Sequence, residues 1–272
     1  MNRIEEKFSA AAAQGESALV GFVTAGDPDL SRSFEIIEAM CGAGIDILEL
    51  GVPFSDPTAD GPVIQRSSAR ALKSGANMSQ ILDMTRKLRD RTDVPIILFS
   101  YYNPILAYGT DRFYGDALAA GADGTLVVDL PPEESAELTG AWDFSRFALI
   151  RLVAPTTPAE RMKRIAADAA GFLYMVSKTG VTGSAGLDTA SVAHHVAVLR
   201  NATKLPICVG FGISTAEDVS ALSRTADGVV IGSAFERLIE ENLTRPDLPA
   251  LVAERTRVYK EATKRAPIQP SR

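Results

Sequence analysis

The sequence is poor in cysteine and histidine. Cys41 and Cys208 are its only cysteines, too few for a disulfide framework, and they suit a reducing compartment. The only histidines, His194 and His195, are adjacent on a predicted helix, where neighbouring residues do not share a face. We therefore expect no metal site and no histidine-based catalytic triad.

Excess positive charge and long apolar runs are also missing. The 272 residues carry a formal net charge of −6, which argues against a nucleic-acid partner but permits a small phosphorylated ligand. No apolar run approaches the ~20 residues of a membrane-spanning helix. The charged start, Met1–Lys7, does not resemble a signal peptide. We expect a cytoplasmic protein without a membrane partner.

Short apolar runs recur along the chain, and each is followed by a longer amphipathic stretch. The runs are rich in Val, Ile and Leu, as strands of a parallel sheet are when both faces are covered. The predicted strands are Leu19–Thr24, Ile45–Gly51, Pro95–Tyr101, Gly124–Asp129, Phe147–Val153, Phe172–Ser177, Pro206–Gly210 and Gly228–Gly232.

Helical patterns lie between these runs. The predicted helices are Ser31–Cys41, Ser79–Asp90, Asp111–Ala120, Pro132–Trp142, Pro158–Ala167, Thr189–Asn201, Thr215–Leu222 and Leu248–Thr263. Two further helical segments are predicted at Asn2–Gln14 and Ser233–Glu240.

Eight strand–helix pairs without a long linker favour a closed barrel. The length suits one α/β barrel of ~250 residues. We predict a (β/α)8 TIM barrel as a single domain over residues 1–272, with an extra N-terminal helix and a short helix after the eighth strand. An open Rossmann sheet would need Gly-x-Gly-x-x-Gly after the first strand, which Thr24–Pro28 does not provide.

Glu49 lies near the C-terminal end of the second predicted strand. Strand alternation places it on the same face as Ile45 and Ile47. If that face points inward, a carboxyl group enters the end of the barrel where catalytic residues lie. Burial beside Leu48, Leu50 and Phe54 would then raise its pKa, as a general acid/base requires. Alternatively, Glu49 faces the helices and pairs with a basic residue.

Two aspartates follow in the next loop. Asp60 precedes Gly61-Pro62, where a helix cap is the plain interpretation. Asp56 precedes Pro57, which is typical of a turn.

Glycine-bearing turns follow the last three strands. They are Thr182-Gly183, Gly210-Phe211-Gly212 and Gly232-Ser233, the last opening a short predicted helix. Barrels often bind phosphate with such late loops and the N-terminus of a short extra helix. The alternatives are that each glycine serves only its turn, and that Ser233 and Glu236 form a capping box.

The stretch Leu48–Gly61 resembles the signature of the tryptophan synthase alpha chains. The resemblance extends over essentially the whole chain and includes Tyr101–Pro104, Val128–Pro131, Gly180–Gly183 and Gly210–Ile213. Thr58, where the family usually has an apolar residue, and Lys178, where it usually has arginine, depart from the pattern. The resemblance implies retro-aldol cleavage of indole-3-glycerol phosphate to indole and D-glyceraldehyde 3-phosphate, a step of tryptophan biosynthesis.

The resemblance also implies roles for individual residues. Glu49 would move protons at indole C3 and at the glycerol hydroxyl, and Asp60 would accept the indole N–H. Thr182, in a loop that closes over the substrate, would hydrogen-bond Asp60. The phosphate would be held by Gly183, Gly212, Gly232 and Ser233, and the indole pocket lined by Phe22, Tyr101 and Tyr174. As lone aromatics, these three are equally typical of core packing.

The family resemblance further implies a partner. The alpha chains pair with a beta chain that condenses indole with serine on pyridoxal phosphate, in a heterotetramer of two alpha and two beta chains. Asp56, Pro57, Asn103 and Pro104 match loops on the partner side. This chain itself is expected to hold no cofactor.

Three other functions stay open at this point. A Schiff-base aldolase would use Lys178 after the sixth strand. A non-catalytic phosphate-binding subunit would leave Glu49 idle. Indole-glycerol-phosphate synthase is a further phosphate barrel, disfavoured by the signature around the second strand.

Overall fold

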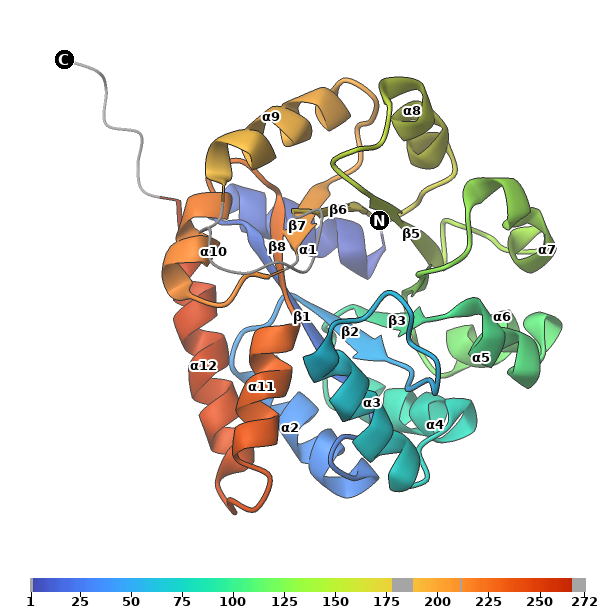
Figure 1. The fold of residues 1–272 in the computed structure, drawn as a ribbon, viewed down its shortest axis with the longest axis vertical. Helices are drawn as coiled ribbons and strands as arrows, with labels where there is room; N and C mark the ends of the chain where they lie inside the picture. The colour runs from blue at the N-terminus through green and yellow to red at the C-terminus, as the bar shows by residue number, and fades with distance from the viewer. Residues whose placement is uncertain (1, 178–187, 211, 266–272) are drawn as a thin grey trace.

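Eight parallel strands close into a barrel in the computed structural model, which describes residues 2–177, 188–210 and 212–265 (Figure 1). The strands pair in chain order, and the last pairs with the first. They are β1 (Ala18–Thr24), β2 (Ile47–Gly51), β3 (Ile96–Ser100), β4 (Gly124–Val127), β5 (Ala148–Val153), β6 (Leu173–Val176), β7 (Ile207–Gly210) and β8 (Gly228–Ile231). The predicted (β/α)8 barrel is confirmed.

Helices surround the strands (Figure 1). They are α1 (Arg3–Ala13), α2 (Leu30–Gly42), α3 (Pro62–Lys73), α4 (Met78–Arg89), α5 (Tyr102–Tyr108), α6 (Thr110–Ala119), α7 (Ala136–Thr139), α8 (Ala159–Ala167), α9 (Thr189–Arg200), α10 (Ala216–Leu222), α11 (Ser233–Glu241) and α12 (Leu248–Ala262). The extra N-terminal helix and the helix after β8 are thereby confirmed as α1 and α11. Among the described residues, no helix has the length and apolar character needed to cross a membrane.

The alternation of side chains along each strand creates two apolar cores. Leu48 and Leu50 point outward and pack in the core between strands and helices. Val20 and Ile47 point inward and pack inside the barrel, in the same cluster as Phe8 of α1. The Phe8 ring meets Phe172 at a centroid distance of 5.7 Å, so α1 closes the end of the barrel where the strands begin. The opposite end is left for a site.

One helix prediction was wrong, and two helices were not predicted. The segment predicted as a helix at Pro132–Trp142 forms a 3-10 turn at Pro132–Glu134 and the single turn α7. Helix α3 escaped prediction because its buried face consists of Ser67, Ser68 and Ala71, which give no apolar period. Helix α5 was not predicted because only Ile105 is buried within its seven residues, which gives no apolar period.

Candidate active site

A cavity of about 630 Å³ opens where the strands end. Its wall is largely apolar, with polar groups from several different elements, which is typical of a small-molecule site. The lining residues are Phe22, Glu49, Ala59, Asp60, Gly61, Pro62, Val63, Ile64, Phe99, Val128, Leu152, Tyr174, Val176, Gly212, Ile213, Val230, Gly232, Ser233 and Arg237. One cavity therefore brings both predicted catalytic carboxyl groups together with three of the four predicted phosphate-binding residues.

Glu49 points into this cavity from β2. Its side chain is fully buried, and neither carboxyl oxygen has a hydrogen-bond partner among the described residues. Burial alone raises the pKa of Glu49 to about 8. The inward orientation is confirmed, and the alternative pairing with a basic residue is not found in the described part of the chain.

The neighbours expected around Glu49 were wrong in detail. Leu48 and Leu50 lie in the outer core, on the opposite face of β2. Phe54 packs against Tyr101 at a centroid distance of 5.3 Å and lines a different groove. The carboxyl group is desolvated by the barrel interior instead.

Asp60 is held by a tyrosine and does not act as a cap. Helix α3 has Gly61 at its N-cap and lacks a side-chain capping bond, so the plain interpretation of Asp60 was wrong. The Tyr101 hydroxyl donates to the Asp60 side chain and accepts from the Ala59 N–H at 2.9 Å. Burial raises the pKa of Asp60 to about 6, and the bond from Tyr101 limits that rise.

The three predicted indole-pocket aromatics lie in two places. Phe22 and Tyr174 line the cavity, and the Phe22 ring meets Phe99 edge-on at 5.0 Å. Tyr101 is not among the lining residues but supports the Asp60 loop from outside the cavity. Gly210 is explained by this packing, because a side chain at that position would collide with the Tyr174 hydroxyl.

Two of the three predicted phosphate turns lie at least partly within the described residues, and their backbone suits an anion. Gly212 has φ of +74°, a conformation that favours glycine. Helix α11 begins at Ser233, with Gly232 at its N-cap and without a side-chain capping bond. The alternative of a capping box between Ser233 and Glu236 is therefore wrong, and in the first turn only the N–H groups of Phe235 and Glu236 donate to the Gly232 carbonyl, which leaves those of Ser233 and Ala234 without an intrahelical acceptor. Such a helix start attracts anions.

Arg237 was missed by the sequence reasoning. It follows Ser233 by four residues on α11, so both lie on one helix face. It is exposed and is the single basic residue among the described residues that line the cavity. The four-residue spacing from Ser233 was the signal available in the sequence.

Comparison with known proteins identifies the family of this chain. The family model for "Tryptophan synthase alpha chain" matches residues 8–266. The chain belongs to the tryptophan synthase alpha chain family. It is 66% identical to the alpha chain of Desulfosudis oleivorans, over 97% of this chain and 100% of that one. The alpha chain of Desulfatibacillum aliphaticivorans is 61% identical, with the same two coverages.

Solved structures of the alpha chain family share the fold. The alpha subunit of tryptophan synthase from Legionella pneumophila superposes with a TM-score of 0.88 at 37% identity, covering 97% of this chain and 98% of that one. A structure of tryptophan synthase from Mycobacterium tuberculosis gives 0.87 at 30% identity, covering 98% and 100%.

The other predicted site residues lie either outside the described part of the chain or away from the cavity. Thr182, Gly183 and the lysine of the rival aldolase, Lys178, fall outside the described residues. Asn103 and Pro104, at the start of α5, line a second groove of about 430 Å³. Asp56 and Pro57 lie in the neighbouring loop, where Asp56 is exposed and accepts from the Ser55 hydroxyl at 2.5 Å.

Proposed function

We propose that this alpha chain cleaves indole-3-glycerol phosphate by general acid/base catalysis with Glu49 and Asp60, releasing indole and D-glyceraldehyde 3-phosphate. One observation carries the proposal. The cavity is bordered by a buried carboxyl group, by a second carboxyl group in a more polar setting and by the N-terminus of α11. Membership of the family supports the same carbon–carbon lyase activity.

The two carboxyl groups divide the proton transfers. Asp60, as the anion, accepts the indole N–H and stabilises the charge that develops as the ring tautomerises. Neutral Glu49 donates its proton to indole C3, and the resulting carboxylate takes the proton of the glycerol hydroxyl. The bond between indole C3 and the glycerol chain then breaks, its electrons return to the ring, and Glu49 ends protonated as it began.

The environments of the two groups suit these roles. The pKa of Glu49 is raised to about 8 by burial, and that of Asp60 only to about 6, because Tyr101 donates to it. Between pH 6 and 8, Glu49 is therefore mostly neutral while Asp60 is mostly ionised.

The phosphate group of the substrate is proposed to lie at the late turns. Gly212, Gly232 and Ser233 would surround it with backbone N–H groups and one hydroxyl, and Gly183 would complete the set. Arg237 adds a positive charge on the same helix, which a dianion in a cavity with two acidic groups needs. The indole ring would lie between Phe22 and Tyr174, and Thr182 would close over Asp60.

The beta chain is proposed to dock where Asn103 and Pro104 lie, in a complex of two alpha and two beta chains. The groove there is lined largely by apolar side chains, including Phe54, Leu72 and Met78. Phe54 contacts Tyr101, which holds Asp60, so a docked partner would be coupled to the site. Pyridoxal phosphate is expected in the beta chain, and the complex in the cytoplasm.

Indole release from indole-3-glycerol phosphate, with and without a beta chain, tests the proposal. We expect Glu49→Gln and Asp60→Asn each to lower the rate by about 10²-fold or more, the contribution of positioned acids and bases. Glu38→Gln, at an exposed position of α2, is the matched control. Wild-type rates in both site variants would refute the mechanism.

A further inference from the structure

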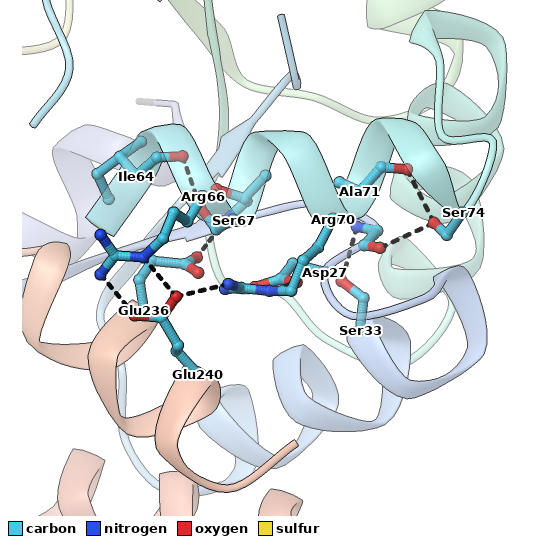
Figure 2. A network of polar contacts seen from close by, with 12 residues as sticks. Asp27, Ser33, Ile64, Arg66, Ser67, Arg70, Ala71, Ser74, Glu236 and Glu240 are labelled. Carbon is cyan, nitrogen blue, oxygen red and sulfur yellow. Dashed lines mark hydrogen bonds and ion pairs between the residues drawn. The ribbon is translucent and has the colours of Figure 1, made fainter. Parts of the chain in front are cut away.

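A polar network joins helix α11, helix α3 and the loop after β1 (Figure 2). Helix α11 contributes Glu236 and Glu240, helix α3 contributes Arg66 and Arg70, and Asp27 comes from the loop after β1. None of these five side chains lines the cavity. The proposed mechanism makes no use of them.

Glu236 is the buried centre of this network. Its side chain is fully buried one turn into α11, and its Oε1 accepts the N–H of Thr24, the last residue of β1, at 2.6 Å. Its Oε2 has no conventional donor among the described residues. The carboxyl group instead lies beside that of Asp27, and two carboxyl groups can share a hydrogen bond only when one of them holds a proton.

The geometry identifies which acid holds that proton. The Arg70 guanidinium donates two hydrogen bonds to Asp27, from Nε to Oδ1 at 2.7 Å and from Nη2 to Oδ2 at 2.8 Å. Such a fork is typical of a carboxylate anion. Asp27 is thus the anion and Glu236 the neutral acid. Burial, followed by the charge of Asp27, raises the pKa of Glu236 well above its ordinary value, in agreement.

Arg70 and Glu240 extend the network along the two helices. Arg70 Nη1 donates to Glu240 at 2.8 Å, and Glu240 also pairs with Arg66 through two bonds of 2.7 Å. These ion pairs are partly exposed and contribute little stability by themselves. Their placement matters more, because they hold α3 beside α11 (Figure 2).

The two helices begin at the two functional ends of the cavity. Helix α11 starts at Ser233, in the proposed phosphate site, and α3 starts at Pro62, two residues after Asp60. The Thr24 hydroxyl also bonds the Ser67 hydroxyl of α3 at 2.6 Å. Both helices are therefore bonded to Thr24 at the end of β1: α3 through the Ser67 hydroxyl and α11 through the Glu236 carboxyl group.

We propose that Glu236 is a positioning residue which, as a neutral acid bridging the Thr24 N–H and Asp27, sets the position of the proposed phosphate site relative to Asp60. It touches neither the cavity nor the substrate. The inference rests on the proposed phosphate site at Gly232 and Ser233, and it adds that this site depends on a proton held one helical turn away.

Binding of glycerol 3-phosphate, measured by calorimetry on the full chain, tests the proposal. Glu236→Gln keeps both an acceptor for the Thr24 N–H and a donor for Asp27, so its affinity should stay within about threefold of wild type. Glu236→Met and the shorter Glu236→Asp lose the bridge and should weaken binding by about tenfold or more, since small displacements of a site are costly. Glu241→Met, at an exposed position of the same helix, is the control.

The outcomes separate the possible failures. If Glu236→Asp, or a folded Glu236→Met, binds as wild type and only its melting temperature falls, the residue is merely structural and the proposal is overturned. If Glu236→Gln fails like Glu236→Met, the group acts as an anion and the neutral bridge is wrong. If wild type itself does not bind glycerol 3-phosphate, the proposed phosphate site fails first.

Discussion

Single side chains in this protein acquire their chemistry from where the barrel places them. Glu49 and Asp60 are both carboxylic acids, yet the barrel interior desolvates one completely and a tyrosine hydroxyl stabilises the anion of the other. Their pKa values are separated to about 8 and about 6.

The activity should have a bell-shaped pH dependence. kcat/KM for indole release reports the free enzyme, so it should rise as Asp60 ionises near pH 6 and fall as Glu49 loses its proton near pH 8. Binding of glycerol 3-phosphate over the same range is the control for titration of the phosphate group. Activity that keeps rising from pH 8 to 9 would contradict the role of neutral Glu49.

Glu49→Gln should stabilise the protein above pH 5. The pKa of Glu49 is about 8 in the folded state against an ordinary 4.5, so the native state holds a proton that the unfolded chain has lost. The free energy of unfolding of wild type therefore falls as pH rises from 4.5 to 8. Glutamine removes this penalty, which reaches about 3 kcal/mol at pH 7.

Denaturant unfolding at pH 4.5 and pH 7 measures this difference. The variant should match wild type at the lower pH and exceed it at the higher one, whereas Glu38→Gln should change little at either. An equal effect of Glu49→Gln at both pH values would show that the carboxyl group is not titrating as expected.

At the scale of elements, helix termini carry more of the site than helix interiors. The first turn of α11 presents Ser233 to the cavity, while the same turn buries Glu236 on its other side. The alternative interpretation of these two residues as a capping box fails because the Glu236 carboxyl group accepts the N–H of Thr24 instead. A local pattern was overridden by a contact between residues 212 positions apart.

Arg237 should contribute charge to phosphate binding. Arg237→Gln removes the positive group beside Ser233 and should raise KM for indole-3-glycerol phosphate by about tenfold, while Arg237→Lys should keep most of the affinity. The loss should shrink at high salt, since the residue is exposed. Steady-state kinetics at two ionic strengths measure both effects.

Arg224→Gln is the matched control for this experiment. Arg224 is exposed and precedes β8, at the barrel end opposite the cavity. If Arg237→Gln and Arg224→Gln have the same KM, the proposed role of Arg237 is wrong.

The two ends of the barrel differ, because one is closed by a helix and the other is open. Helix α1 fills the end where the strands begin, through Phe8, and the other end holds the cavity and the apolar groove beside it. The groove shares its loop with Asp60, so chemistry and proposed docking lie on one side of the barrel. This arrangement is a property of the closed fold and not of one element.

Filling the groove should weaken binding of the beta chain. Ala107 is exposed and lines the groove on α5, so Ala107→Arg places a long charged side chain where an apolar surface would dock. We expect the dissociation constant to rise by about tenfold or more. Sedimentation with a purified beta chain measures it. Ala159→Arg, exposed on α8, is the control, and equal binding by both variants would place the interface elsewhere.

The sequence by itself determined the order of the strands and the glycine turn after β7, whereas it left open which face of β2 points inward: Ile45, expected on the face of Ile47, packs in the outer core instead. The strand order and the turn depend on local periodicity and on backbone conformations such as that of Gly212, which neighbouring residues dictate. Family resemblance supplied the roles of Glu49 and Asp60, which strand position alone left open.

The tertiary structure alone decided how distant residues meet. Tyr101 reaches Asp60, and Glu236 reaches Thr24 and Asp27, only because the barrel closes and brings β1 beside α3 and α11. Helix α3 could not be predicted from the sequence for the same reason. Its buried face carries serines, and Ser67 bonds Thr24 there in place of an apolar contact. Pairings across long sequence separations leave no local period, so they could be seen only in the folded chain.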